Sequence, residues 1–579
     1  MITLRSLATI FGILNSVAIL VFLVSSGAIS SESEEAYLQE QIESRKFVNK
    51  DLALAVLREL DSHEIMPDNY FMLGKTPRKF FNKTYFGLKR NPEYCNQVQE
   101  RLVNDPSFIF EEMNFVTNFL PDTLVRHKLM PLLGRDLMPH VSYVNLTEKQ
   151  RETPLFLFPE QANIFYFSNM IHQYHEYGHE IACTFQAYSH VPGVEALCRK
   201  DYASNSVAAY TKKFEDRPQC YDGSKFFPKT INLFNKTDCQ NFFKLINSEQ
   251  YKKQKEEQTI LFIRKAGVGA HQGKTVFPVD EEQERKLREE YKNGSLCGRT
   301  NKSDLIQSYI QNPLLVEGHK FDFRIYAMIA SSNPLIVYYH DGFLRVSLFE
   351  YDVTSKEKGM HLTNTAQSLK VIEKAKKQGM NETELRNFQM WNLTRFTKYL
   401  VSIGKVESID WLDEYLRPSL QHAIQHAIRM SQEKYYTASP SFDLLGMDFM
   451  LDEDLNLWFL ESNIGPALEG SNDEKERMIS KLVKDQLEIV TAYLKSRTKR
   501  AIKYINWLGQ TGLAKFNENG ELKISKLDQR KKEFKAILKN YIDEEFEISS
   551  DNGWVKIIDE NLEGLGRYNG MFNIECFDF

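Results

Sequence analysis

Two carboxylates and one amide near the end of the chain form the set of side chains best suited to chemistry. Asp448 lies in one apolar arm of the segment FDLLGMDFMLDEDLNLWFLESN, whereas Glu461 and Asn463 lie in the other arm. Side chains alternate between the faces of a strand, so Glu461 and Asn463 share a face, and a hairpin brings Asp448 beside them. Such oxygen donors suit Mg²⁺, which takes phosphate oxygens as further ligands. A solvated polar strand face is the alternative, although the apolar flanks FML and WFL indicate burial.

A second segment supplies positive charge. In HKFDFRIY, Lys320, Asp322 and Arg324 alternate with apolar residues, and Arg345 follows on the next apolar run. The alternation predicts a strand with one charged, mostly cationic face and one apolar face. Cations opposite a carboxylate–Mg²⁺ site are what a nucleoside triphosphate requires. Ordinary surface salt bridges are the alternative interpretation.

The segment HEYGH suggests a different chemistry, because H-E-x-x-H places two imidazoles, here His175 and His179, on one helical face around a zinc ion. A zinc peptidase needs a third ligand, and EIACTFQAYSH lacks the Gly and His that would extend the motif. Glu195 is the remaining third-ligand candidate. We therefore favour the interpretation of HEYGH as one face of an amphipathic helix.

The elements that must position these residues alternate along the chain. Residues 35 to 180 read as mostly helical, and short β-rich runs begin near residue 258. The pair Asp341–Gly342 between two apolar runs predicts a hairpin turn. Helical patterns return over 366 to 436 and again after Gly470. This order predicts an α+β or mixed α/β catalytic body with an N-terminal helical or α/β module and a helical C-terminal tail.

The bulk properties exclude little. The chain has 579 residues, 42% of them hydrophobic, and a net charge of −5, so no general binding of nucleic acid is expected. The basic runs LKSRTKRAIKY and LDQRKKEFKAILK could meet an acidic polypeptide, and solvated faces of two helices are the favoured alternative.

The first residues point toward a membrane. An apolar run from Leu7 to Val24 follows one cation, Arg5, and small residues end it near Ala28. We expect a signal peptide or signal anchor over residues 1–28, and a catalytic body that is membrane-anchored or lumenal. A hydrophobic helix of a soluble protein is the alternative. Seven N-x-[ST] sequons agree with a glycoprotein. Six of the seven cysteines precede residue 300, which fits disulfides and buried reduced thiols equally well.

Several segments together closely resemble the tubulin tyrosine ligase-like family, which has an ATP-grasp fold. They are SYIQNPLLVEGHKFDFRIY, PLIVYYHDGFLRVS, HLTNTAQ and FDLLGMDFMLDEDLNLWFLESNIGPAL, with HVPGVEALCRKD and FFPKTINL similar to the elements that precede the catalytic body. The resemblance runs from about His190 to about Leu494. It gives expected boundaries of 1–28 for the signal segment, 29–185 for an N-terminal module, 186–495 for the ligase-like domain and 496–579 for a C-terminal extension.

The resemblance implies roles for particular residues. Asp448, Glu461 and Asn463 match the family's magnesium ligands. Lys320, Arg324 and Arg345 match cations that contact phosphate and acyl phosphate, and Arg324, Lys320 and Glu461 are the expected catalytic residues. Further nucleotide-binding candidates are Gln307, Tyr309 and Ile310 at the adenine hinge and Asn364 in the segment HLTN, which begins at His361.

The implied chemistry is an ATP- and Mg²⁺-dependent ligation. The γ-phosphoryl group passes to a carboxylate, and the amine of a free amino acid attacks the acyl phosphate. The acceptor in the family is usually tubulin, with cytoplasm or cilium as the alternative localisation; translocation would make it a lumenal protein.

The expected phosphate loop departs from the family pattern. It reads FIRKAGVGAHQGKTV, in which Arg264 or Lys265 could take the family's lysine position, and we favour Lys265. Val268 stands where a Walker A motif needs glycine, so that motif is rejected. Because phosphoryl transfer depends on positioning, an ATP-binding pseudoenzyme or scaffold is the alternative function.

Overall fold

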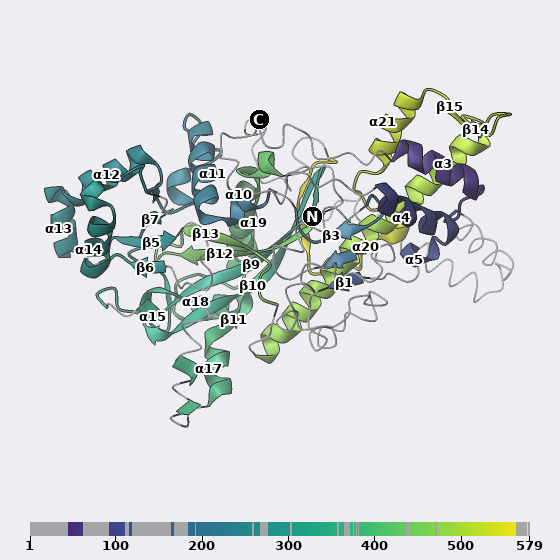
Figure 1. Ribbon diagram of the computed structural model, residues 1–579. Helices are drawn as coiled ribbons and strands as arrows, with labels where there is room; N and C mark the ends of the chain where they lie inside the picture. Colours follow the sequence, from purple (N-terminus) through teal and green to yellow (C-terminus); the bar gives the residue numbers. More distant parts are fainter. Residues whose placement is uncertain are drawn as a thin grey trace, which may run out of the picture. The chain divides into compact units, whose positions relative to one another are not determined.

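The computed structural model divides into two compact units, each described by itself (Figure 1). One unit consists of Met1–Ser62, Asn96–Glu111 and Lys495–Lys539, and the other of His63–Cys95, Glu112–Leu494 and Asn540–Phe579. The structure describes residues 44–61, 92–110, 115–117, 164–166, 183–191, 193–257, 260–266, 276–300, 304–355, 358–363, 371–373, 376–377, 379, 381–435, 441–468, 472–562 and 576. HEYGH, Asn364, residues 1–28 and the glycines after Lys265 lie outside these ranges.

A large sheet forms the centre of the second unit. Its strands follow the order β11-β10-β9-β12-β13, with β16 also pairing with β10 and β8 with β9. All these pairings are antiparallel. The bounds are β8 Leu315–Val316, β9 His319–Ser332, β10 Leu335–Glu350, β11 Met390–Asn392, β12 Asp443–Leu451, β13 Leu457–Ile464 and β16 Val555–Asp559.

The alternation expected in HKFDFRIY is present in β9. Phe321, Phe323 and Ile325 are fully buried in one apolar cluster with side chains from helices α18 (Leu393–Ser402) and α19 (Arg417–Arg429). The intervening residues Lys320, Asp322 and Arg324 therefore lie on the opposite face of the sheet. The apolar packing fixes which face of β9 carries charge, because a slip of one residue would exchange the two faces.

The hairpin turn expected at Asp341–Gly342 is wrong. Both residues lie inside β10, and the chain reverses instead between Ser332 and Leu335. The pairing of β9 with β10 shifts register between His340 and Phe343, as at a β-bulge. Glycine is required there because a Cβ on Gly342 would lie 1.7 Å from the carbonyl oxygen of Arg324. The pair is thus a bulge signal, which local sequence does not distinguish from a turn.

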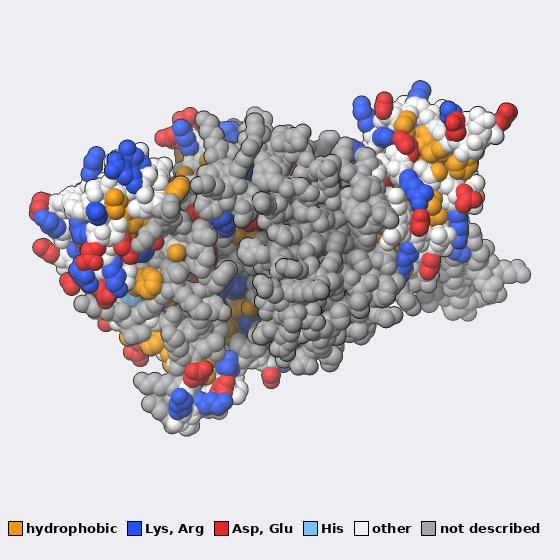
Figure 2. Space-filling view, viewed as in Figure 1, with side chains coloured by type: hydrophobic (Ala, Val, Ile, Leu, Met, Phe, Trp, Pro, Cys, Tyr) orange, Lys and Arg blue, Asp and Glu red, His pale blue; other side chains and the backbone are white. Residues whose placement is uncertain are grey.

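A smaller sheet belongs to the same unit. Strands β4 (Thr230–Asn232), β7 (Asp304–Ser308), β5 (Phe262–Ala266) and β6 (Val276–Pro278) are neighbours in that order and are antiparallel. Helices α12 (Lys236–Ile246), α13 (Glu249–Glu257) and α14 (Glu281–Glu290) lie beside it (Figure 1). Buried Phe242, Leu287 and Ile306 form one apolar cluster from α12, α14 and β7, so the helices cover one face of the sheet. The outer surface of these helices mixes Lys and Arg with Asp and Glu, as Figure 2 shows.

A connecting segment leads into these sheets. It contains α10 (Glu195–Cys198) and α11 (Lys200–Lys213). The same unit also includes two other helices, α15 (Lys358–His361) and α17 (Glu382–Gln389). Three short parallel strands belong to it as well: β1 (Phe115–Thr117), β2 (Ile164–Tyr166) and β3 (Ala187–Tyr188). The buried carboxylate of Asp443 in β12 accepts a hydrogen bond from the backbone nitrogen of Val191 at 3.0 Å and lies 3.4 Å from Nδ1 of His190. This buried contact ties the segment that precedes α10 to the strand that carries Asp448.

The C-terminal part differs from a purely helical tail. Helix α20 (Asp473–Gln510) crosses the boundary between the units near the expected position, after Leu494. The first unit holds α3 (Lys50–Leu60), α4 (Pro92–Asn104) except its first turn, α5 (Ser107–Phe110), the hairpin β14 (Ala514–Phe516) and β15 (Leu522–Ile524), and α21 (Leu527–Ile537). Residues after Asn540 return to the second unit, where β16 pairs with β10.

The two basic runs are partly used inside the first unit. Arg497 and Lys499 are each only 4% exposed. Lys531 forms an ion pair with Glu59 at 3.0 Å, and Arg530 pairs with Glu533 at 2.5 Å. The runs are therefore not the simple solvated helix faces that the sequence favoured.

Six of the seven cysteines form disulfides. The pairs are Cys95–Cys183, Cys220–Cys576 and Cys239–Cys297, and Cys198 is the remaining thiol. Of the two alternatives that the sequence left open, the structure therefore shows disulfides rather than buried reduced thiols. Four of the six cysteines before residue 300 pair with one another, whereas Cys220 pairs with Cys576 and Cys198 stays a free thiol.

Candidate active site

The two predicted carboxylates face each other across the hairpin of β12 and β13. Asp448 is directly paired with Glu461, and Gly446 with Asn463. The amide nitrogen of Asn463 lies 3.4 Å from Oδ2 of Asp448 and 3.4 Å from the carbonyl oxygen of Gly446. The hairpin therefore brings together the three side chains that the sequence grouped.

Two arginines hold Asp448. Strand β9 pairs with β12 so that Arg324 is the direct neighbour of Asp448. Arg324 donates from Nε to Oδ1 of Asp448 at 2.6 Å and from a terminal nitrogen to Oδ2 at 3.1 Å, and Arg345 contacts the same Oδ2 at 2.8 Å. The two cations thus lie beside the carboxylate on adjacent strands of one sheet.

Asp322 fixes the position of Arg345. Arg345 makes a bidentate contact to Asp322 at 2.6 and 2.7 Å, and the hydroxyl of Thr363 donates to Oδ2 of Asp322 at 2.6 Å. Burial alone would lower the pKa of Arg345, but Asp322 and Asp448 raise it above its ordinary value. Arg345 therefore stays charged in a buried place, as a bidentate arginine–carboxylate pair allows.

Glu461 has its own cation. Nζ of Lys200 lies 3.0 Å from Oε2 of Glu461, with 15% and 27% of the two side chains exposed. Burial alone would raise the pKa of Glu461, but Lys200, Lys265 and Arg345 lower it to about 2. Glu461 is therefore ionised at neutral pH.

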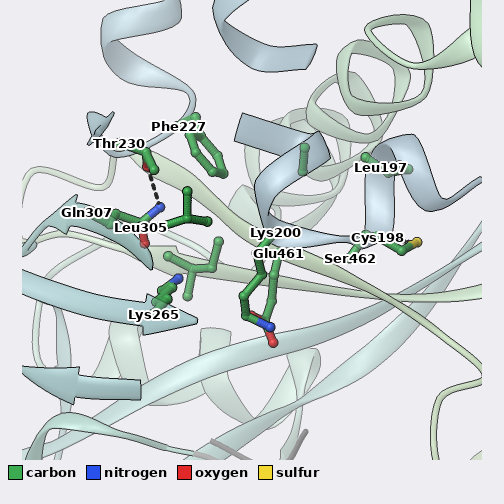
Figure 3. Close-up of a pocket in the computed structure, with 12 residues that line it drawn as sticks. Leu197, Cys198, Lys200, Phe227, Thr230, Lys265, Leu305, Gln307, Glu461 and Ser462 are labelled. Carbon is green, nitrogen blue, oxygen red and sulfur yellow. Dashed lines mark hydrogen bonds and ion pairs between the residues drawn. The ribbon is translucent and has the colours of Figure 1, made fainter. Parts of the chain in front are cut away.

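An open cleft of about 330 Å³ lies between these residues and the small sheet (Figure 3). Lys265 and Gln307 reach it from β5 and β7, and Glu461 and Ser462 reach it from β13. The connecting segment contributes Leu197, Cys198, Lys200 and Ala203. Apolar walls with a few charged groups are typical of a ligand site.

Arg264 and Lys265 lie on opposite faces of β5. Arg264 lies on the face away from the cleft, where it pairs with Asp304 at 2.8 Å and Glu290 at 2.7 Å. Lys265 lines the cleft, and burial lowers its pKa to about 8. Lys265 is therefore the lysine placed to meet a ligand.

Lys320 lies in a separate buried cluster. Its Nζ donates to the hydroxyl of Tyr309 at 3.1 Å and lies 4.4 Å from the centre of that ring. The same hydroxyl contacts Tyr351 at 3.1 Å and Nδ1 of His361 at 2.8 Å. Burial lowers the pKa of Lys320 to about 7. The cluster links the expected hinge residue Tyr309 to the segment HLTN. The two other expected hinge residues lie outside this cluster: Ile310 is half-buried, and the side chain of Gln307 donates a hydrogen bond to Thr230 at 3.0 Å.

Comparison with known proteins identifies the fold to which this cleft belongs. The model of the tubulin-tyrosine ligase family matches residues 179–500, which is more than half of the chain. The chain belongs to the tubulin-tyrosine ligase family. A mixed α/β fold with an ATP-grasp-type body, expected from the sequence, is thereby confirmed.

Named members of the tubulin-tyrosine ligase family are similar to this chain. The inactive polyglycylase TTLL10 of Homo sapiens is 28% identical over 317 residues, which are 52% of this chain and 44% of that protein. The tubulin polyglutamylase TTLL7 of Mus musculus is 30% identical over 296 residues, or 49% of this chain and 29% of that protein. The tubulin glycylase 3A of Drosophila melanogaster is 33% identical over 187 residues, or 32% and 18%. The chain spans less than half the length of these relatives.

The expected membrane-anchored or lumenal localisation is contradicted. Within the described residues, no helix is both long enough and apolar enough to cross a membrane. The relatives include a tubulin glycylase and a tubulin polyglutamylase by name. Residues 1–28, on which the expectation depended, lie outside the described ranges.

The residues at the edge of this tubulin-tyrosine ligase cleft fit a magnesium ion with a nucleotide. Asp448 and Glu461 are directly paired carboxylates that offer oxygen donors, and Asn463 adds an amide oxygen. Among the described residues no cluster of three or more His, Cys, Asp or Glu side chains could hold a metal ion. Two carboxylates and one amide leave positions open, and phosphate oxygens commonly complete the coordination of Mg²⁺.

The sequence interpretation missed three residues of the candidate site. Lys200 lies in the quoted segment HVPGVEALCRKD but was given no role, and its contact with Glu461 joins positions far apart in the chain. Asp322 was recognised only as part of an alternating strand. Thr363 lies in HLTN, beside His361, and its contact with Asp322 depends on how α15 packs on β10. Only Asp322 carried a local signal, as the one acidic residue on a cationic face.

Proposed function

We propose that this chain is an ATP- and Mg²⁺-dependent ligase that joins a free amino acid to a carboxylate of a protein. The main support is the convergence of Asp448, Glu461 and Asn463 with Arg324 and Arg345 at the edge of the cleft. Membership of the tubulin-tyrosine ligase family supports the same reaction class. Tubulin is the first acceptor to test, because several relatives are tubulin glycylases or polyglutamylases by name.

In this proposal each group has a defined task. Asp448, Glu461 and Asn463 would hold Mg²⁺, which neutralises charge on the phosphates when it is bound. Lys265, which lines the cleft, and Lys320, once released from Tyr309, would bind phosphate oxygens, while Arg324 and Arg345 would offer rigid donors to an acyl phosphate. The hinge residues Gln307, Tyr309 and Ile310, with Asn364, would contact the nucleotide.

The reaction is balanced by two transfers. A carboxylate oxygen of the acceptor attacks the γ-phosphorus of ATP, giving ADP and an acyl phosphate. The amino group of the second substrate then attacks the acyl carbon, inorganic phosphate leaves, and the amine loses its proton. Cations aimed at the transferred group lower the barrier because they are already in place.

The test measures nucleotide binding and turnover separately. We expect ATP with Mg²⁺ to bind the purified chain, and Glu461→Gln to weaken metal-dependent binding by about 10- to 100-fold, because a neutral amide is a poorer ligand. Isothermal titration gives the affinities, and incorporation of labelled glycine, glutamate or tyrosine into tubulin gives turnover. Glu453→Gln, an exposed change in the turn after β12, is the matched control. Unchanged binding in Glu461→Gln would overturn the metal assignment.

A nucleotide-binding pseudoenzyme is the second candidate. It is favoured by two observations: a relative from Homo sapiens is an inactive polyglycylase by name, and the loop after Lys265 departs from the family pattern. This candidate binds ATP with Mg²⁺ but transfers no amino acid. Incorporation of any one of the three labelled amino acids would exclude it.

A further inference from the structure

Lys200 is the first residue of α11 and reaches the cleft from outside both sheets. The turn that carries it is held on two sides. Arg199 forms an ion pair with Asp201 at 2.7 Å, and Sγ of Cys198 lies 3.4 Å from the hydroxyl of Ser462 in β13. These contacts fix the start of α11 against the strand of Glu461. The lysine therefore leaves a well-supported backbone rather than a loose loop.

The charged end of Lys200 meets Glu461, as Figure 3 shows. The separation of 3.0 Å and the limited exposure of both side chains make this a partly buried ion pair. One carboxylate oxygen of Glu461 is therefore already in contact with a cationic side chain. The ammonium group lies against Oε2 of Glu461, one of the two oxygens that could bind a metal ion.

Both carboxylates of the candidate metal site, Asp448 and Glu461, are paired with cationic side chains. Asp448 is held by Arg324 and Arg345, and Glu461 by Lys200 with Lys265 nearby. A divalent cation that entered alone would meet this group of positive charges. Coulomb repulsion between partly buried charges at such distances is strong because solvent screens it little.

We propose that Lys200 is a positioning residue that holds the place of the metal ion on Glu461 until a nucleoside triphosphate enters the cleft. The phosphates offer Lys200 a new anionic partner, and Glu461 then becomes available to the metal. Metal and nucleotide thus bind together rather than independently. The inference rests on the proposed function and adds that the nucleotide must enter before Glu461 can bind the metal.

Removal of the Lys200 charge should strengthen metal binding without nucleotide and weaken the binding of the nucleotide itself. Without nucleotide, Lys200→Met removes the competitor, and we expect the affinity for Mn²⁺ to rise about tenfold or more, as loss of a close like charge implies. With nucleotide, the same change removes a phosphate partner, and we expect about tenfold weaker binding of the nucleotide. A residue that only supported the fold would weaken both.

The experiment titrates Mn²⁺ into the full chain and follows the electron paramagnetic resonance signal of the free ion. Each titration is run without nucleotide and with a non-hydrolysable ATP analogue. Lys200→Arg keeps the charge and should behave as the original chain does. Lys212→Met, an exposed lysine on the same helix, is the matched control. Lys200→Gln repeats the measurement should Lys200→Met fail to fold, as judged by its melting curve.

Two outcomes overturn the inference. One is an unchanged or weaker Mn²⁺ affinity of Lys200→Met without nucleotide, and the other is tight Mn²⁺ binding by the original chain without nucleotide. The proposed function fails in a different way, namely if the original chain binds no metal–nucleotide complex at all. The Mn²⁺ titration without nucleotide still decides the role of Lys200 in that case.

Discussion

At the scale of single residues, two lysines near the cleft have charges that depend on what fills it. Burial lowers the pKa of Lys320 to about 7 and that of Lys265 to about 8. Phosphate oxygens beside either amine would favour the charged form and raise its pKa again. Nucleotide binding above pH 7 must therefore be accompanied by proton uptake.

We predict that ATP binds with uptake of protons at pH 8, that little uptake occurs at pH 6, and that affinity falls as the pH rises above about 7. Titration calorimetry in two buffers of different ionisation enthalpy measures the proton count. Lys320→Arg, which stays charged, should reduce the uptake. Equal heats in both buffers at pH 8 would contradict the prediction.

The same lysines link stability to pH. In the unfolded chain they keep their protons up to about pH 10.4, so above pH 7 the unfolded state binds more protons than the folded state. Their contribution to the free energy of unfolding of the nucleotide-free protein therefore rises with pH between about 7 and 10. Below pH 7 both states are protonated, and the full cost of burying the charge remains.

Residue types and short spacing were enough to group Asp448, Glu461 and Asn463, because a hairpin is a local structure. The same reasoning could not find Lys200, because its partner Glu461 lies 261 positions further along the chain. It also placed Lys320 among the phosphate cations without its contact to Tyr309, whose hydroxyl in turn bonds to His361. Long-range side-chain contacts depend on the packing of helices that spacing does not encode.

At the scale of elements, Gly342 shows how a sheet overrides a local turn signal. The bulge in β10 brings the backbone of β10 against the carbonyl oxygen of Arg324, and only a residue without a Cβ fits. Arg324 is one of the two arginines on Asp448. The bulge thus lies behind a residue of the candidate site.

We predict that Gly342→Ala lowers the free energy of unfolding by about 3 kcal/mol, because a Cβ would force two backbones apart in a packed sheet. Urea denaturation followed by fluorescence measures the change. Glu350→Ala, at the exposed end of the same strand, should leave stability nearly unchanged. A neutral effect of Gly342→Ala would show that the bulge can relax.

The sequence predicted the strands of the large sheet better than their connections. Alternation in β9 and the two arms of β12 and β13 follow from apolar packing on one face, which the residues display directly. The turn at Asp341–Gly342 was misplaced because the same dipeptide suits a bulge. The return of the chain through β16 had no local signal, since a strand of five residues matters only beside β10.

At the scale of the whole molecule, the disulfides join distant parts of the second unit. Cys220 and Cys576 are separated by 356 positions, and both are buried. We predict that the double change Cys220→Ser with Cys576→Ser lowers the free energy of unfolding by about 2–5 kcal/mol, as loss of a native disulfide usually does. Urea denaturation of the oxidised proteins measures this, with Cys198→Ser as the control.

The thiol count of the oxidised chain checks the pairing first. Alkylation in denaturant without reductant should label one cysteine of the seven, and mass spectrometry should locate the label at Cys198. Labelling of Cys220 or Cys576 would show that the distant pair is open.

The pairing of β16 with β10 also determines when one edge of β10 is covered during translation. Strand β10 is complete at residue 350, but its partner ends at Asp559, so more than 200 further residues must be translated before that edge is covered. Until then β10 presents unpaired backbone groups where β16 will lie, and such edges invite association with other chains. The nascent chain therefore exposes this part of β10 while those residues are made, and a chain interrupted before β16 would be prone to aggregation.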